Sequence, residues 1–154
     1  MRHRPGRLVL FLLVLLLAAP CAAREPDKAV TLITQKEAAM KDAPSGLQEI
    51  GRPLNDGPAI KVIAPETDGT YRSPLKIIVQ FLPRSEHRVD LSKLKVECLK
   101  FFTINLTDRV MPYASTWGIR MAKASIPSGH YRIRITIGDD KGGVTQDVFT
   151  FNVK

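Results

Sequence analysis

The histidines, the cysteine and the serines of this chain are the residue types that could support catalysis or metal binding. After residue 23 the sequence contains two histidines, His87 and His130, and one cysteine, Cys98. No His-x-His, His-Glu-x-x-His or Cys-x-x-Cys spacing occurs, so the sequence does not predict a preformed zinc site. The Gly-x-Ser-x-Gly motif of serine hydrolases is also missing.

Two segments, Ser73–Lys76 and Ser92–Lys95, match the Ser-x-x-Lys pattern of some serine enzymes. That pattern works at the start of a helix, whereas both lysines fall on strands predicted below. An enzyme would otherwise need a cluster built from loop residues, chiefly Ser85, His87 and Asp90. We therefore predict a protein without catalytic residues and without a cofactor.

The acidic pair in GDDKGG, Asp139 and Asp140, could contribute oxygen ligands to a cation. An EF-hand loop spreads about five ligands over 12 residues, and here two carboxylates stand beside Lys141. Asp and Gly tolerate the backbone angles of a tight turn. The segment is therefore predicted to be a hairpin turn.

Strict alternation of residue types on either side of this turn predicts two strands within residues 126–154. One side of the first strand carries Tyr131 and three isoleucines, and the other side carries His130, Arg132, Arg134 and Thr136. Successive side chains of a strand point to opposite faces, so one face is buried and the other meets water.

Seven short strands at intervals near ten residues predict an all-β, antiparallel, immunoglobulin-like β-sandwich over residues 59–154. The paired cysteines around a tryptophan of antibody domains are missing. Cys98 alternates with Leu94 and Val96, which predicts a buried, unreactive thiol. The predicted strands are 60–64, 75–81, 91–102, 105–113, 118–123 and the two of the C-terminal hairpin.

The N-terminus has the pattern of a secretory signal peptide, residues 1–23. Three arginines precede an apolar run, Leu8–Ala19, which is followed by small residues up to Ala23. The run is shorter than the ~20 residues of a membrane-spanning helix, so no transmembrane span is expected in the mature chain. We expect a periplasmic or secreted protein. A lipid anchor on Cys21 is the alternative, although Pro20 departs from the usual lipobox.

Removal of residues 1–23 takes away three of 23 basic residues and none of the 15 acidic ones, so the formal charge falls from +8 to +5. An exported chain with this charge is not expected to bind nucleic acid. The expected partner is an unknown protein or envelope component, and the positive charge favours an acidic one. The contact candidates are the exposed-loop aromatics and the outward arginines of the C-terminal hairpin: Tyr113, Trp117, Arg132 and Arg134.

Residues 24–58 are polar and rich in Pro and Gly, which indicates a flexible, mostly irregular extension. One short helix is predicted near residues 35–41. Thr34 and Glu37 have the Thr-x-x-Glu spacing of a capping box, in which each side chain bonds the backbone N–H of the other residue.

Several segments resemble a family of small bacterial periplasmic proteins of unknown function. They are ITQKEAA, SPLKIIVQFLP, VDLSKLKVECLK, INLTDRVMPY and the stretch from WGIRMAKAS to the C-terminus, within residues 31–154. The resemblance implies a signal peptide, a short extension and one immunoglobulin-like domain, and it implies no catalytic residues.

The ending IPSGHYRIR followed by VFTFNV is also similar to the end of periplasmic copper-resistance carriers. Such carriers use a histidine near the mature N-terminus, whereas this chain is predicted to begin Arg24-Glu25-Pro26 after cleavage. A copper-carrier alternative would therefore depend on an improvised soft site of His130, Met111 and Met121.

Overall fold

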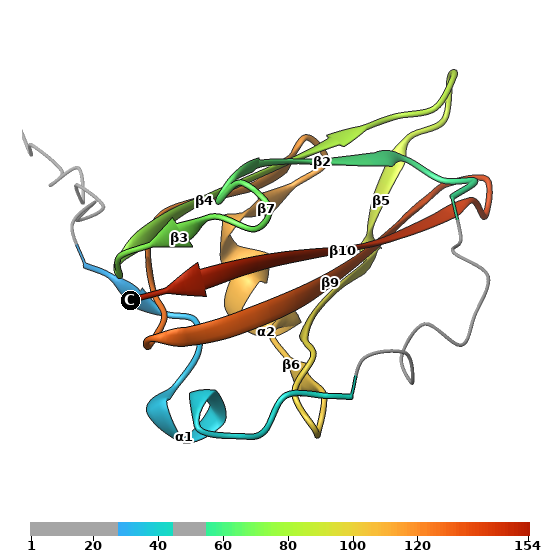
Figure 1. Cartoon of the computed structure of the whole chain (residues 1–154). Helices are drawn as coiled ribbons and strands as arrows, with labels where there is room; N and C mark the ends of the chain where they lie inside the picture. The colour runs from blue at the N-terminus through green and yellow to red at the C-terminus, as the bar shows by residue number, and fades with distance from the viewer. Residues whose placement is uncertain (1–27, 45–54) are drawn as a thin grey trace, which may run out of the picture.

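A computed structural model describes residues 28–44 and 55–154, which form two β-sheets packed against each other (Figure 1). The described strands are β1 (Val30–Thr31), β2 (Ala59–Ala64), β3 (Thr70–Tyr71), β4 (Leu75–Leu82), β5 (Val89–Cys98), β6 (Ile104–Asn105), β7 (Ala114–Ser115), β8 (Gly118–Ser125), β9 (Gly129–Asp139) and β10 (Val144–Val153). The helical segments are α1 (Gln35–Ala38), α2 (Thr107–Val110) and the 3-10 turn η1 (Met111–Tyr113).

The order of the strands is that of an immunoglobulin-like sandwich. One sheet runs β1-β8-β4-β2, with β7 also paired to β8, and the other runs β3-β10-β9-β5-β6. The central strands β2-β4-β8 and β10-β9-β5 correspond to strands A-B-E and G-F-C of that architecture. The predicted two-sheet β-architecture is therefore present.

A buried tyrosine provides a second feature of such sandwiches. Tyr131 lies near the start of β9, and its hydroxyl donates a 2.8 Å hydrogen bond to the carbonyl of Pro127, four residues upstream. A tyrosine near the start of strand F that bonds back to upstream backbone is a tyrosine corner. Its ring stacks on Phe151 of the adjacent β10, so the corner is part of the core.

The predicted alternation in the C-terminal hairpin is confirmed. Tyr131, Ile133, Ile135 and Ile137 are each at most 4% exposed, while the residues between them face outward. Cys98 is fully buried, and burial raises the pKa of its thiol to about 11. The thiolate is the reactive form, so the prediction of an unreactive thiol agrees with this environment.

The prediction of seven strands in purely antiparallel sheets is wrong. The structure describes ten strands between residues 30 and 153, and two pairings, β1 with β8 and β3 with β10, are parallel. Strands β1 and β3 have two residues each, which is too short for an alternating pattern to be visible in a sequence.

The strand predicted over residues 105–113 is also wrong, because this segment forms α2 and η1. The Asn105 side chain accepts a hydrogen bond from the Thr107 backbone N–H and starts the turn. Leu106 and Val110 then lie four residues apart, and both are buried. That spacing places two apolar side chains on one face of a helical turn, and this burial decides the conformation.

Residues 28–44, within the segment predicted to be a flexible extension, pack on the sandwich. Strand β1 pairs with the end of β8, and Leu32 and Ile33 are at most 4% exposed. The capping box between Thr34 and Glu37 is confirmed at the start of α1. Glu37 also forms a bidentate ion pair with Arg109, at 2.7 and 2.8 Å, which fixes α1 to α2.

The predicted signal peptide, its cleavage after Ala23 and the lipidation alternative at Cys21 lie outside the described residues. Among the helices that the structure does describe, none is long and apolar enough to span a membrane.

Candidate binding site at one end of the sandwich

Three connections between strands meet at one end of the sandwich, which we call the loop end. They are residues 83–88 between β4 and β5, residues 116–117 between β7 and β8, and residues 140–143 between β9 and β10. Two hollows lie between these connections. One is lined by residues of the β4–β5 and β7–β8 connections, and the other by residues of the β4–β5 and β9–β10 connections. In immunoglobulin variable domains the B–C and F–G loops at one end carry binding.

Asp139 holds the turn between β9 and β10 in place. Its carboxylate is fully buried and accepts hydrogen bonds from the backbone N–H groups of Lys141 and Gly143, at 2.9 and 2.8 Å. Its second oxygen lies 2.8 Å from His87 Nδ1. The hydrogen bond from His87, with the two backbone bonds, holds the pKa of Asp139 below its usual range. The predicted hairpin turn thus has a side-chain anchor.

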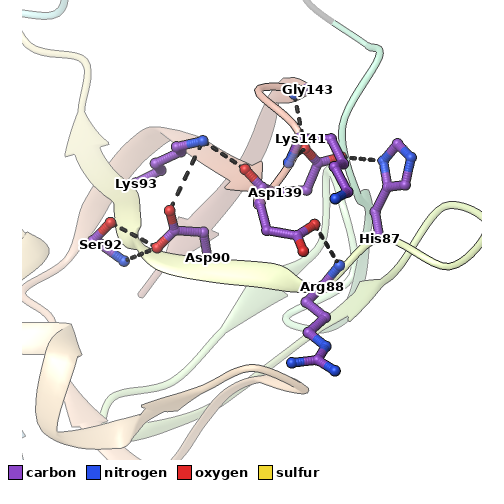
Figure 2. Close-up of polar contacts among 9 residues, drawn as sticks. His87, Arg88, Asp90, Ser92, Lys93, Asp139, Lys141 and Gly143 are labelled. Carbon is purple, nitrogen blue, oxygen red and sulfur yellow. Dashed lines mark hydrogen bonds and ion pairs between the residues drawn. The ribbon is translucent and has the colours of Figure 1, made fainter.

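Further hydrogen bonds connect this turn to the β4–β5 connection and to β5 (Figure 2). The Arg88 backbone N–H donates to the Asp140 carboxylate at 2.9 Å, and the Asp140 N–H donates to the Arg88 carbonyl at 3.0 Å. From β5, the Lys93 ammonium donates to the Asp139 carbonyl at 2.5 Å. Two loops that are about 50 residues apart in the chain are therefore tied together before any ligand arrives.

Trp117 lies at the tip of the β7–β8 hairpin and is 76% exposed. Its backbone is fixed, because its carbonyl accepts a hydrogen bond from Phe81 N–H in β4 and its own N–H donates to Ser115 Oγ. Gly118 follows with φ 137°, and a Cβ there would lie 2.0 Å from the Val79 carbonyl oxygen. Glycine is therefore required at the position that presents the tryptophan.

The two hollows share His87 and Arg88 and differ in their other walls. The first has a volume of about 230 Å³ and is lined by Pro83, His87, Arg88, Val89, Thr116 and Trp117. The second is wider, about 680 Å³, and is lined by Ser85, Glu86, His87, Arg88, Asp140 and Lys141. The first is an aromatic and cationic recess of side-chain size, and the second is a shallow, polar surface.

Of the four contact residues proposed from the sequence, only Trp117 lies at the loop end with an exposed side chain. Tyr113 is half-buried and packs against the core from η1. Arg134 pairs with Glu97 at 2.9 Å on the outer face of the β9–β5 pair. Arg132 is half-buried in the same strand, away from the loops.

The positive charge of the outward arginines of the C-terminal hairpin is partly neutralised by Glu97. This carboxylate is 5% exposed and pairs with Lys95 at 2.8 Å as well as with Arg134. Glu97 has an outward position in β5, between the inward Val96 and Cys98. The sequence pattern of β5 predicts that Glu97 faces outward. It does not predict that Glu97 lies beside Arg134, because the pairing of β5 with β9 cannot be read from the sequence.

The residues of the copper alternative are not brought together. Met121 is 2% exposed in the core between the sheets. His130 lies on the outer side of β9 and bonds Asn152 through Nδ1 at 3.0 Å, and Met111 lies on η1. In residues 28–44 and 55–154, no group of three or more His, Cys, Asp or Glu side chains is placed to hold a metal ion.

The loop cluster considered for catalysis is only partly assembled. His87 bonds Asp139, whereas Asp90 accepts hydrogen bonds from Ser92 and lies 3.8 Å from Lys93. Within the described part of the chain, no hydrogen bond joins Ser85 to His87. The His87–Asp139 pair could not be predicted from the sequence, because the two residues are 52 positions apart.

A second exposed aromatic group lies at the opposite end of β5. Phe101 and Phe102 are 60% and 71% exposed, and their rings meet edge to face at 5.0 Å. The adjacent Lys100 is already paired with Asp42 at 2.6 Å. This end offers an apolar contact, whereas the loop end adds hollows and ionic groups.

Comparison with protein families finds no match, and comparison with curated proteins finds none. Three similar solved structures are an endo-β-1,4-mannanase from Thermotoga petrophila (12% identity, 63% of this chain and 20% of that chain, TM-score 0.44), fibronectin(III)-like modules of Clostridium thermocellum CbhA (13%, 62% and 46%, 0.38) and murine CRIg (12%, 63% and 96%, 0.39). The chain thus spans about a fifth and about half of the first two. Likenesses at this level carry no inference about its activity.

Proposed function

We propose that this protein is an exported, non-catalytic binding domain of immunoglobulin-like architecture that contacts a protein or envelope component through its loop end. The observation that carries the proposal is Trp117, which is 76% exposed on a fixed backbone beside a hollow lined by Arg88 and His87. Tryptophan and arginine are the residue types most often found at the energetic centre of protein interfaces.

The rigidity of the loop end supports binding rather than a disordered contact. The His87–Asp139 pair and the two backbone bonds of Asp140 hold the β4–β5 and β9–β10 connections in one arrangement. A surface that is ordered before association loses less conformational entropy when a partner binds.

Export is the second part of the proposal, and it depends on the sequence of residues 1–23. The basic start and the short apolar run favour a cleaved signal peptide and a periplasmic or secreted location, with a lipid anchor at Cys21 as the alternative. The resemblance to small periplasmic proteins agrees with this location. Mass spectrometry of the protein from its own host would give the mature N-terminus and any acyl group.

Chemical crosslinking in the native envelope tests the binding role. We expect Trp117→Ala to reduce the trapped complex at least about tenfold while the protein remains folded, since an anchoring tryptophan typically contributes 2 kcal/mol or more. The matched control is Phe102→Ala, which removes a similarly exposed aromatic from the opposite end. A complex that survives Trp117→Ala and is lost in Phe102→Ala would place the contact at the opposite end and contradict the proposal.

A further inference from the structure

We propose that the loop end recognises an acidic peptide segment of a partner protein, with Trp117 against an apolar side chain and Arg88 and Lys141 against carboxylates. This inference rests on the proposed function and adds the chemistry of the partner.

Except for the exposed Glu86, the acidic groups of the loop end and its flanking strands are already engaged. The Asp139 carboxylate is buried and bonds His87 and two backbone N–H groups. One oxygen of Asp140 accepts the Arg88 N–H, and Asp90 is held by Ser92. These contacts satisfy much of the acceptor capacity of the three carboxylates, so they attract a cationic ligand weakly.

By contrast, two basic side chains of the loop end are available to bind a ligand. Arg88 and Lys141 are exposed, and within the described residues neither the guanidinium nor the ammonium forms an ion pair. In Figure 2 the Arg88 guanidinium extends away from the His87–Asp139 pair, on the side opposite its hydrogen-bonded backbone. Of the remaining exposed charges nearby, Arg84 and Glu86 have opposite signs. The charge open to a ligand is therefore positive, which fits an acidic partner.

The smaller hollow gives the apolar part of the match. Its described lining residues include Pro83, Val89 and Trp117, and none of them carries a carboxylate. A volume of about 230 Å³ suits one large side chain rather than an extended polymer. Arg88 lines both hollows, so an acid next to the inserted side chain would meet its guanidinium, which can bind a carboxylate through two N–H groups.

His87 provides a third polar contact in a fixed orientation. Its Nδ1 faces Asp139, so Nε2 is the ring nitrogen that a ligand in either hollow can reach. The ring is held by a carboxylate that is itself fixed by two backbone N–H groups. A ligand therefore meets an oriented imidazole, which favours directional hydrogen bonding over a purely electrostatic contact.

Selection from a random peptide library on the purified protein, with counter-selection on Trp117→Ala, tests the inference. We expect enriched peptides that place two or more Asp or Glu residues next to an aromatic or large aliphatic residue. A synthetic peptide of this kind should bind the Arg88→Gln/Lys141→Gln double variant about tenfold or more weakly than the wild type. Replacing Glu with Gln in the peptide should weaken its binding to the wild type by a similar factor. Binding should also weaken as the salt concentration is raised. The control Lys61→Gln/Lys76→Gln removes two exposed lysines from β2 and β4 and should leave the affinity unchanged.

Two results would overturn the inference. Trp117-dependent peptides that are neutral or basic, or that ignore the Arg88/Lys141 variant, would show that the loop end binds without selecting acids, which leaves the proposed function intact. The absence of any Trp117-dependent peptide would exclude a peptide as the occupant. The crosslinking comparison of Trp117→Ala with Phe102→Ala then decides the proposed function independently.

Discussion

Asp139 connects two loops of the candidate site through one carboxylate. It has no exposed surface, and its three hydrogen bonds come from both sides of the loop end. Such a group stabilises the folded state only while it is ionised. Because its folded pKa is below the ordinary value, the stabilisation is present above the unfolded pKa, roughly 4, and is lost as pH falls through the lower folded pKa.

Replacing Asp139 with Asn should therefore lower the melting temperature by several degrees at neutral pH. The difference between the two proteins should shrink as pH falls below about 4, because the carboxylate of the unfolded wild type then binds a proton and that of the folded protein does so only at lower pH. Thermal unfolding followed by circular dichroism across this range measures it. Asp147→Asn, at an exposed position of β10, is the control and should cost little. A difference that persists unchanged at low pH would contradict the ionic role.

Tyr131 makes a testable contribution at the same scale. Its hydroxyl donates to the Pro127 carbonyl, and burial raises the pKa of the phenol to about 12, so it remains a donor. Tyr131→Phe should cost about 0.5–1.5 kcal/mol of unfolding free energy, the usual net value of one hydrogen bond. Tyr113→Phe is the matched control, with an expected cost near zero. Equal costs in urea unfolding would argue against the tyrosine corner as a stabilising element.

At the scale of elements, the segment before β2 is part of the sandwich. Ile33 is 1% exposed and sits between β1 and α1, which are held to β8 and α2. Ile33→Ala should destabilise the protein by about 2–5 kcal/mol, the range for truncating a buried aliphatic side chain. Thr31→Ala, at an exposed neighbouring position, should change the unfolding free energy little. A small effect of Ile33→Ala would instead favour the flexible extension that the sequence predicts.

The Glu37–Arg109 pair gives this segment a pH dependence. The guanidinium of Arg109 lowers the pKa of Glu37 to about 2. The pair therefore stabilises the docked segment above the ordinary carboxylate value, and this is lost as pH falls from about 4.5 to about 2. Glu37→Gln should remove about 1–2 kcal/mol at neutral pH, after allowance for solvent screening, and flatten stability over that acid range. Lys36→Gln, on the exposed side of α1, is the control. Parallel acid curves for wild type and Glu37→Gln would contradict it.

The long strands could be predicted from the sequence because their alternation is local. Tyr131, Ile133 and Ile135 specify the inner face of β9 without reference to any other segment. The helical turn α2 could not be predicted in this way. The spacing of Leu106 and Val110 suits one face of either a strand or a helix, and contacts with β5 decide between the two. The loop end could not be predicted either. His87 and Asp139 meet only because the fold brings two distant connections to one end.

At the scale of the whole molecule, the loop end and the N-terminal segment lie at opposite ends of the sandwich. Strand β8 begins at Gly118 beside Trp117, and β1 pairs with its far end at Ala124 and Ser125 (Figure 1). Residue 28, where the described part of the chain begins, therefore lies away from the loops.

The central claim is that the loop end makes the contact, and in-cell photocrosslinking tests it most directly. A photoreactive amino acid would be placed at Thr116, exposed beside Trp117, or at Phe102, exposed at the opposite end. We predict a discrete crosslinked species from Thr116 that disappears when Trp117→Ala is added, and none of comparable yield from Phe102. Crosslinking from Phe102 alone, or a Thr116 product that is indifferent to Trp117→Ala, would contradict the account.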